Sequence, residues 1–274
     1  MGLERLATLF AAMQQKSSAA LVLYFTAGDG GADATAAQIV AAAEAGADLI
    51  ELGVPFSDPS ADGPVIEAAM VRALASGMRP DTIAKTLAIA ATVRRSSAVP
   101  IVLFGYYNPL LQFGPERLAD AAAAAGIDGV LTVDLPPEHD DQLGPALARR
   151  GLASIRLLAP TTSPSRAATI AAHASGFLYY VSIAGVTGAA SLDARRAAEH
   201  LGTLRPACKG LPICAGFGVR SPADVAALAP VVDGVVVGSA IVKQLYEARE
   251  LPREQQLAAL RATTAALKAA CRRG

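Results

Sequence analysis

The chain has few cysteines and no excess of charge of either sign. Its 274 residues include three cysteines, Cys208, Cys214 and Cys271, which lie far apart and form no C-x-x-C pair. This spacing indicates neither a disulfide framework nor a zinc site, and it fits a reducing cytoplasm. The 24 Lys and Arg residues balance the 24 Asp and Glu residues and are scattered, so no basic surface for nucleic acid is expected.

Long hydrophobic runs are also missing. Although 53% of the residues are apolar, charges, glycines or prolines interrupt every apolar stretch before it could span a bilayer. Residues 1–10 place apolar side chains at helical spacing with charges between them, unlike the uninterrupted core of a secretory signal. We therefore expect an N-terminal helix, no membrane partner and a cytoplasmic protein. No linker or low-complexity tract divides residues 1–274, which favours a single domain.

Short apolar runs alternate with alanine-rich helical stretches along the chain. The runs that predict strands are residues 20–26, 47–52, 99–104, 128–133, 153–158, 177–182, 211–215 and 233–237. The intervening stretches have a helical period, most clearly at residues 36–45, 115–125 and 221–228. Eight strand-then-helix units predict a (β/α)8 TIM barrel of the α/β class, with the N-terminal helix as an addition. A doubly wound sheet usually needs fewer strands, and the first turn has no G-x-G-x-x-G, so the barrel is favoured.

Two carboxylates are associated with the second predicted strand. Strand alternation puts Glu51 on the same face as Leu49, so that Glu51 points into an interior. Its pKa should be raised there, as a proton-transferring group needs, but a structural Glu held by a neighbouring donor is an equal alternative at this point. The Gly- and Pro-rich residues 53–64 predict an ordered loop that can present Asp58 and Asp62, although either Asp could simply start a turn.

The predicted strand ends lack both lysine and a histidine cluster. Without a lysine at these ends, Schiff-base lyase chemistry has no nucleophile. His139, His173 and His200 fall in predicted loops or helices and are most simply surface or helix residues, so no metal site is indicated. Carboxylate acid–base catalysis between aromatic walls is the chemistry that remains.

Glycines gather on the loops after the last three predicted strands. Residues 185–188, 216–218 and 238–240 read GVTG, GFG and GSA, and the last of these begins a helix. Glycine lets backbone N–H groups approach a phosphate, and a helix N-terminus favours negative charge. A single glycine would indicate only a tight turn, but glycines on three successive loops favour a phosphate site, which recurs after strands seven and eight of such barrels. The expected substrate is a small phosphate ester with a flat apolar part.

These segments resemble a known family, the α subunit of tryptophan synthase. The resemblance covers nearly the whole chain and is carried by YFTAGD (24–29), ELGVPFSDP (51–59), ADGP (61–64), GYYNP (105–109), DLP (134–136), YYVS (179–182), GVTG (185–188), GFGV (216–219) and GSAIV (238–242). The second of these motifs is highly specific, whereas the glycine motifs are common among phosphate-binding barrels. The resemblance implies retro-aldol cleavage of indole-3-glycerol phosphate to indole and D-glyceraldehyde 3-phosphate, with no cofactor in this chain.

Residue by residue, the resemblance also implies roles for the site. Glu51 would move both protons, and Asp62 would accept a hydrogen bond from the indole N–H. The residues that would bind substrate are Tyr24, Tyr106, Leu131, Tyr179 and Phe217 around indole, Gly188, Gly218, Gly238 and Ser239 around phosphate, and Thr187, which would bond Asp62 when its loop closes. Each aromatic residue could instead be plain core packing.

The resemblance implies a partner as well. The family's α subunit works beside a β subunit that carries pyridoxal phosphate and receives indole through a tunnel, in an expected α2β2 complex, and Ser57, Asp58 and Pro59 match part of the contact. Two alternatives remain open. A stand-alone lyase that releases free indole would share the chemistry residues, and a catalytically idle barrel could serve only as an allosteric partner. The presence of both Glu51 and Asp62 argues against an idle barrel.

Overall fold

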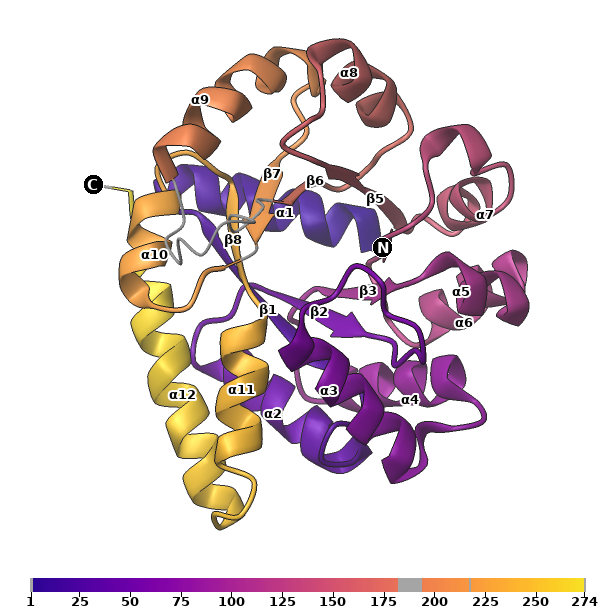
Figure 1. The fold of residues 1–274 in the computed structure, drawn as a ribbon, viewed down its shortest axis with the longest axis vertical. Helices are drawn as coiled ribbons and strands as arrows, with labels where there is room; N and C mark the ends of the chain where they lie inside the picture. Colours follow the sequence, from indigo (N-terminus) through magenta and orange to yellow (C-terminus); the bar gives the residue numbers. More distant parts are fainter. Residues whose placement is uncertain (1, 182–193, 217, 274) are drawn as a thin grey trace.

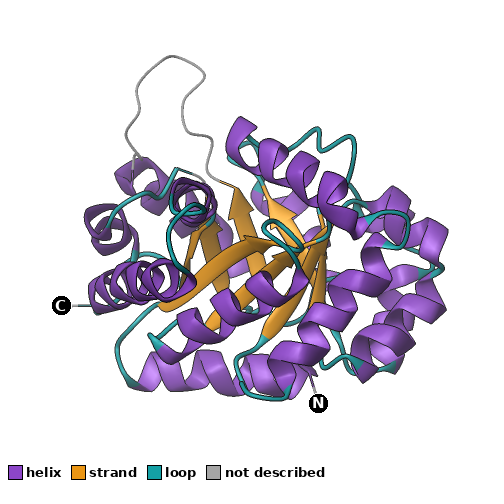
Figure 2. Cartoon of the chain, turned by 90° about the horizontal axis from the view of Figure 1, so that it is seen from below, coloured by secondary structure: helices purple, strands orange, loops and turns teal. Residues whose placement is uncertain are grey.

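Eight parallel strands close into a barrel (Figure 2). The structure is a computed structural model that describes residues 2–181, 194–216 and 218–273. Its strands are β1 (Ala20–Thr26), β2 (Leu49–Gly53), β3 (Ile101–Gly105), β4 (Gly129–Thr132), β5 (Ala153–Leu158), β6 (Leu178–Val181), β7 (Ile213–Gly216) and β8 (Gly234–Val237). Each strand pairs with the next along the chain, and β8 pairs with β1, so the sheet closes on itself. All eight predicted strands are confirmed.

Helices surround the barrel (Figures 1 and 2). They are α1 (Gly2–Gln15), α2 (Ala32–Glu44), α3 (Pro64–Ala73), α4 (Thr82–Arg94), α5 (Tyr107–Phe113), α6 (Pro115–Ala124), α7 (Leu143–Arg149), α8 (Pro164–Ala172), α9 (Ala194–Leu204), α10 (Pro222–Leu228), α11 (Ser239–Glu247) and α12 (Arg253–Ala270). Three short helical turns are η1 (Leu74–Met78), η2 (Pro137–His139) and η3 (Arg205–Ala207). The (β/α)8 fold with an extra N-terminal helix is therefore confirmed. In the described ranges no helix is long and apolar enough to cross a membrane.

The additional helix α1 closes the amino end of the barrel. Its side chains Leu6, Phe10 and Met13 recur at helical spacing, are buried, and join the apolar cluster that fills the barrel interior. Phe10 contacts Phe177, which precedes β6, with ring centroids 5.7 Å apart. Figure 1 shows the helix lying across the strands, and its apolar face covers the amino end of the barrel interior.

Side chains of β2 point alternately inward and outward, as the sequence predicts. Leu49 belongs to the interior cluster, whereas Ile50 and Leu52 belong to the larger cluster between the strands and the helices. Glu51 pairs in register with Tyr24 of β1 and Val102 of β3, both of which are also interior residues. The register therefore aligns Glu51 with inward-facing side chains on both neighbouring strands.

Segments near the two ends of the chain meet beside the β1–β8 junction. Ser18 and Arg272 form an antiparallel bridge. The N–H of Ala19 donates to the carbonyl of Cys271 over 2.9 Å, and the N–H of Arg273 donates to Ser17, also over 2.9 Å. The entry into β1 is thus tied to the exit from α12.

Three strands begin later than the sequence predicts. β2, β3 and β7 start at Leu49, Ile101 and Ile213 rather than at residues 47, 99 and 211, whereas the other strand boundaries agree to within one residue. Pro100 and Pro212 stand directly before β3 and β7, and proline has no N–H with which to pair. Before β2, the side chain of Asp48 accepts from the N–H of Leu21 over 2.7 Å. For these three strands, the apolar run in the sequence therefore begins before the backbone hydrogen bonds that pair the strand with its neighbours.

Candidate active site

A cavity of about 250 Å³ opens at the carboxyl ends of the strands, where barrels of this kind place their chemistry. The residues that line it come from strands β1, β2, β3, β6 and β8, from the loops after β2, β7 and β8, and from the first turns of α3 and α11. They are Tyr24, Glu51, Asp62, Gly63, Pro64, Val65, Ile66, Phe104, Tyr179, Gly218, Val219, Arg220, Val236, Gly238 and Ser239. Two carboxylates thus share one cavity whose walls are otherwise mostly apolar.

Glu51 is the more deeply buried of the two carboxylates. Its side chain projects from β2 into the barrel, and the residue is only 1% exposed. Its Oε1 atom has no hydrogen-bond partner among the described residues. Burial raises the pKa of Glu51 to about 8, because the apolar surroundings disfavour the charged form. The direction agrees with the sequence-based expectation, and it leaves Glu51 holding a proton near neutral pH.

Asp62 is held in place by Tyr106. The Tyr106 hydroxyl donates to Oδ2 of Asp62 over 2.6 Å and accepts from the N–H of Ala61 over 3.0 Å. The Phe56 ring lies 5.3 Å from the Tyr106 ring. Burial raises the pKa of Asp62, whereas the hydrogen bond from Tyr106 opposes that rise. The loop after β2 is therefore fixed to the end of β3 through one phenol.

Glycines at two strand ends leave room for two tyrosine hydroxyls. A Cβ atom on Gly53 would lie 2.1 Å from the Tyr24 hydroxyl, and one on Gly216 would lie 2.5 Å from the Tyr179 hydroxyl. Both distances are shorter than any normal contact, so only glycine fits. Phe104 stands near both rings, with centroids 5.5 Å from Tyr24 and 6.5 Å from Tyr179. These three rings form an aromatic wall beside Glu51.

Part of the cavity lining suits an anion. Gly218 has a φ of +84°, a left-handed conformation that favours glycine. Gly238 precedes α11, and Ser239 is its first residue, so the positive end of that helix faces the cavity. Arg220 also lines the cavity. Backbone N–H groups of glycines, a helix terminus and a guanidinium are therefore all present in the lining.

The structure brings together seven of the twelve residues predicted for the site. Tyr24, Glu51, Asp62, Tyr179, Gly218, Gly238 and Ser239 line the cavity. Tyr106 is 2% exposed and lies against Asp62 rather than on the cavity wall, and Leu131 is fully buried in the interior cluster, opposite Phe104 in the strand register. Thr187, Gly188 and Phe217 lie outside the described residues.

Sequence reasoning missed several wall residues. Phe104 could have been found by carrying the inward register of Glu51 across to β3, two residues beyond Val102. Arg220 could have been noticed as a cation two residues after Gly218. Ile66 and Val65 lie in the first turn of α3 and carried no signal, because an apolar residue there could equally pack against the barrel.

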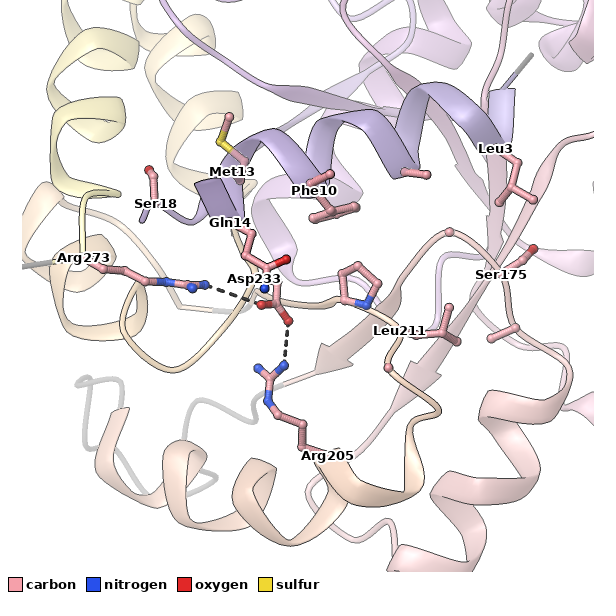
Figure 3. A pocket seen from close by; sticks show the side chains of 16 residues that line it. Leu3, Phe10, Met13, Gln14, Ser18, Ser175, Arg205, Leu211, Asp233 and Arg273 are labelled. Atoms are coloured by element: carbon pink, nitrogen blue, oxygen red, sulfur yellow. Dashed lines mark hydrogen bonds and ion pairs between the residues drawn. The ribbon is translucent and has the colours of Figure 1, made fainter. Parts of the chain in front are cut away.

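A larger cavity of about 700 Å³ lies at the amino end of the barrel, beside α1 (Figure 3). Its one carboxylate, Asp233, stands between Arg205 and Arg273, with N–O distances of 2.8 and 3.5 Å. The same carboxylate accepts from the N–H of Ile213 over 2.9 Å. Because Asp233 is fully engaged, the described residues that line this cavity offer no free carboxylate, and the smaller cavity is the better candidate. Among the described residues, no group of three or more His, Cys, Asp or Glu side chains is placed to hold a metal.

Comparisons with known proteins give one consistent result. The sequence model of the family described as "Tryptophan synthase alpha chain" matches residues 10–272. A relative of that name from Geobacter sulfurreducens is 48% identical over 254 residues, which are 92% of this chain and 95% of the relative. Another of that name, from Caulobacter sp. (strain K31), is 48% identical over 249 residues, or 90% of this chain and 89% of the relative.

Solved structures agree with the sequence comparisons. A chain of Mycobacterium tuberculosis tryptophan synthase has a TM-score of 0.87 and 38% identity to this chain, with 98% of this chain and 99% of that chain covered. Tryptophan synthase subunit alpha from Legionella pneumophila has a TM-score of 0.87 and 36% identity, with coverage of 97% and 98%. The similarity therefore extends over almost the entire fold.

Proposed function

The chain belongs to the tryptophan synthase alpha chain family, and we propose that Glu51 and Asp62 carry out its lyase reaction. That reaction is the retro-aldol cleavage of indole-3-glycerol phosphate to indole and D-glyceraldehyde 3-phosphate in tryptophan biosynthesis. One observation carries the assignment of residues: a buried carboxyl that holds a proton near neutral pH shares a cavity with a second carboxylate.

Glu51 performs both proton transfers in this proposal. Its carboxylic acid first protonates C3 of the indole ring, which leaves positive charge on the ring. The resulting carboxylate then takes the proton from the hydroxyl group on the carbon attached to C3. As that hydroxyl becomes an aldehyde, the electron pair of the carbon–carbon bond moves to C3 and restores the aromatic ring. The net change is one proton moved from oxygen to carbon, and Glu51 ends as it began.

Asp62 stabilises the charge that develops on the ring. As a carboxylate it accepts a hydrogen bond from the indole N–H, whose acidity rises when C3 is protonated. Tyr106 acts as a positioning residue, because its hydroxyl fixes the carboxylate at 2.6 Å. Thr187 is proposed as a further partner for Asp62 when the loop after β6 closes over the substrate.

The remaining predicted residues divide between the two ends of the substrate. Tyr24 and Tyr179 of the aromatic wall contact the indole ring, together with Phe217 and the underlying Leu131. The phosphate binds at the N–H groups of Gly188, Gly218, Gly238 and Ser239, where the positive end of α11 lies. Arg220 supplies a full positive charge near the same place.

The partner in this proposal is a tryptophan synthase β subunit, in an α2β2 complex, which takes up the indole and carries pyridoxal phosphate. None of the steps above needs a cofactor on the α chain. Ser57 and Asp58 are exposed on the loop after β2, which suits the contact with β proposed for residues 57–59. We also propose a cytoplasmic location, where the free and buried cysteines stay reduced.

The test is indole release from indole-3-glycerol phosphate by the purified chain, with and without a cognate β subunit. Weak activity alone, a large rise with β and loss in Glu51→Gln are expected. Fast cleavage that β does not change would favour a stand-alone lyase. Stimulation of β without any cleavage would instead favour an idle allosteric partner and overturn the role of Glu51.

A further inference from the structure

A separate cavity of about 320 Å³ lies outside the barrel wall, next to the end of β1. It is enclosed by α2, α3, α11 and α12, which neighbour one another on this side of the barrel (Figure 1). The volume is at the lower end of the range for small-molecule sites. Helix α11 runs between the two cavities: Gly238 and Ser239 line the candidate active site, whereas Tyr246 lines this cavity.

Positive charge dominates the walls of this outer cavity. Arg72, Arg249 and Arg253 line it, together with a single carboxylate, Asp29. Arg72 and Asp29 form a two-pronged ion pair with N–O distances of 2.9 and 2.7 Å, so these charges compensate each other. Arg249 pairs with Glu250, which lies outside the cavity lining, over 3.4 Å across an exposed gap, and Arg253 has no carboxylate partner among the described residues. The lining itself therefore carries more positive than negative charge.

Those guanidinium groups are held in place by other contacts. Arg249 lies 4.0 Å from the centroid of the Tyr246 ring and donates to the Tyr246 carbonyl over 2.8 Å. Arg72 lies 4.1 Å from the same ring. Arg253 donates to the carbonyl of Asp33 over 3.2 Å. Cations fixed in this way lose little side-chain entropy when they bind a ligand.

A buried amide faces the same cavity. Gln38 of α2 is only 7% exposed and lines the wall. No hydrogen bond of its side-chain amide is found among the described residues, and the amide atoms are not sealed off from the cavity. An amide with both donor and acceptor capacity is therefore available to a molecule in the cavity.

We propose that this outer cavity binds a small oxyanion ligand, a molecule bearing a phosphate or a carboxylate group. Arg249 and Arg253 supply the charge-assisted hydrogen bonds, and the Gln38 amide binds a neighbouring polar atom of the ligand. A planar carboxylate and a tetrahedral phosphate each present two oxygens that the paired N–H groups of a guanidinium can bind, so the ligand can carry either group. The site is independent of the proposed lyase reaction, because none of its residues lines the candidate active site.

The experiment follows the side-chain amide resonance of Gln38 by NMR in the full chain. The resonance is assigned by its absence in Gln38→Leu. Inorganic phosphate and malonate are titrated separately at constant ionic strength, because screening alone would otherwise weaken binding. Variant Arg249→Gln/Arg253→Gln removes the two guanidinium groups that the proposal assigns to the ligand. Arg261→Gln is the matched control. Arg261 lies on α12, as Arg253 does, but it pairs with Glu44 outside the cavity.

A saturable shift of the Gln38 resonance is expected in wild type and in Arg261→Gln. The double variant should bind at least about tenfold more weakly, as expected for lost charge-assisted hydrogen bonds. A shift with phosphate alone would assign a phosphate-bearing ligand, and one with malonate alone would assign a carboxylate. The proposal is overturned if neither anion moves the resonance. It is also overturned if the double variant titrates like wild type, since the shift would then arise from phosphate bound at the active site.

Discussion

At the scale of single residues, the protonation of Glu51 decides when the proposed reaction can begin. Glu51 must carry a proton in order to protonate C3 of the indole ring, and burial raises its pKa to about 8. We therefore expect kcat/KM for indole release to fall above about pH 8 as Glu51 ionises. It should also fall at acid pH, where Asp62 becomes protonated. A pH–rate profile measures both limbs. A rate that stays constant through pH 9 would contradict the proposed role, and the residual rate of Glu51→Gln should lack the alkaline limb.

The hydrogen bond between Tyr106 and Asp62 gives a second prediction. Tyr106→Phe removes a donor to the carboxylate, and kcat should fall roughly tenfold, as expected for one charge-assisted hydrogen bond. Because that bond opposes the rise in the pKa of Asp62, the acid limb of the pH–rate profile should move to higher pH. Tyr107→Phe is the matched control, since no hydrogen bond of its hydroxyl is found among the described residues. A fall in kcat with an unmoved acid limb would indicate a merely structural role.

The sequence predicts the positions of some site residues but not of others. The inward direction of Glu51 follows from strand alternation alone, because the period of two fixes the face. The position of Tyr106 does not follow, because it depends on where a loop folds back against the end of β3. Local patterns thus locate side chains on regular strands but not those that bridge two loops.

At the scale of elements, the ends of β2 and β7 require glycine, because a Cβ atom there would overlap a tyrosine hydroxyl. Gly53→Ala would place a methyl group 2.1 Å from the Tyr24 hydroxyl, so the Tyr24 ring must shift from its place in the cavity wall. We expect a loss of about 1–3 kcal/mol in the free energy of unfolding, as overpacking usually costs, and a clear loss of kcat/KM. Gly202→Ala in α9 is the control, because its methyl group would meet nothing within 4 Å. Chemical denaturation and indole release measure the two effects, and equal behaviour of the variants would refute the steric argument.

A repeated device secures the amino ends of the strands. Asp48, Asp128 and Asp233 each stand just before a strand and accept the N–H of a residue at or near the start of a neighbouring strand, over 2.7, 2.8 and 2.9 Å. Asp128 is fully buried and also pairs with Arg94 and with Arg5 of α1. This end of the barrel therefore serves stability rather than chemistry.

Replacing Asp128 tests whether the amino end of the barrel contributes to stability but not to catalysis. Asp128→Ala leaves the buried N–H of Ile101 and the partly buried guanidinium of Arg94 without their acceptor and should cost about 1–3 kcal/mol in the free energy of unfolding. Asp120→Ala breaks only an exposed pair with Arg150 and should leave the free energy of unfolding nearly unchanged. Urea unfolding measures both values. At temperatures where both variants stay folded, kcat should match wild type, and a selective loss of kcat in Asp128→Ala would contradict a purely stabilising role.

At the scale of the whole molecule, one buried acid should make stability depend on pH. An unfolded Glu has a pKa of about 4.3, whereas burial raises that of Glu51 to about 8. Between these values the folded chain holds a proton that the unfolded chain has released, so this group's contribution to stability is lost as pH rises. Glu51→Gln should then melt at least roughly 2–4 °C above wild type at pH 9 and show little difference near pH 4. Calorimetry at both pH values is the test, and a difference that does not grow with pH would exclude a buried neutral acid.

The overall fold can largely be predicted from the sequence. Each single strand or helix pattern is a weak signal, but the strand-then-helix pattern occurs eight times along the chain. Eight apolar runs separated by helical stretches are typical of only one closed arrangement. We propose that this arrangement is a single domain, since α1 plugs the interior and the segments around Ser18 and Arg272 bind each other. The outer cavity was not predictable, because Gln38, Arg72 and Tyr246 come together only when four helices are in place.

The pairing of β8 with β1 has a consequence for synthesis on the ribosome. The chain emerges from its amino end, so β1 is made first and must wait for β8, the last strand, before its outer edge is covered. Until then the nascent sheet displays the unpaired edges of β1 and of the newest strand, which can pair with other polypeptides. Chaperones that shield exposed strand edges during translation should therefore matter more to this protein than its compact final form suggests.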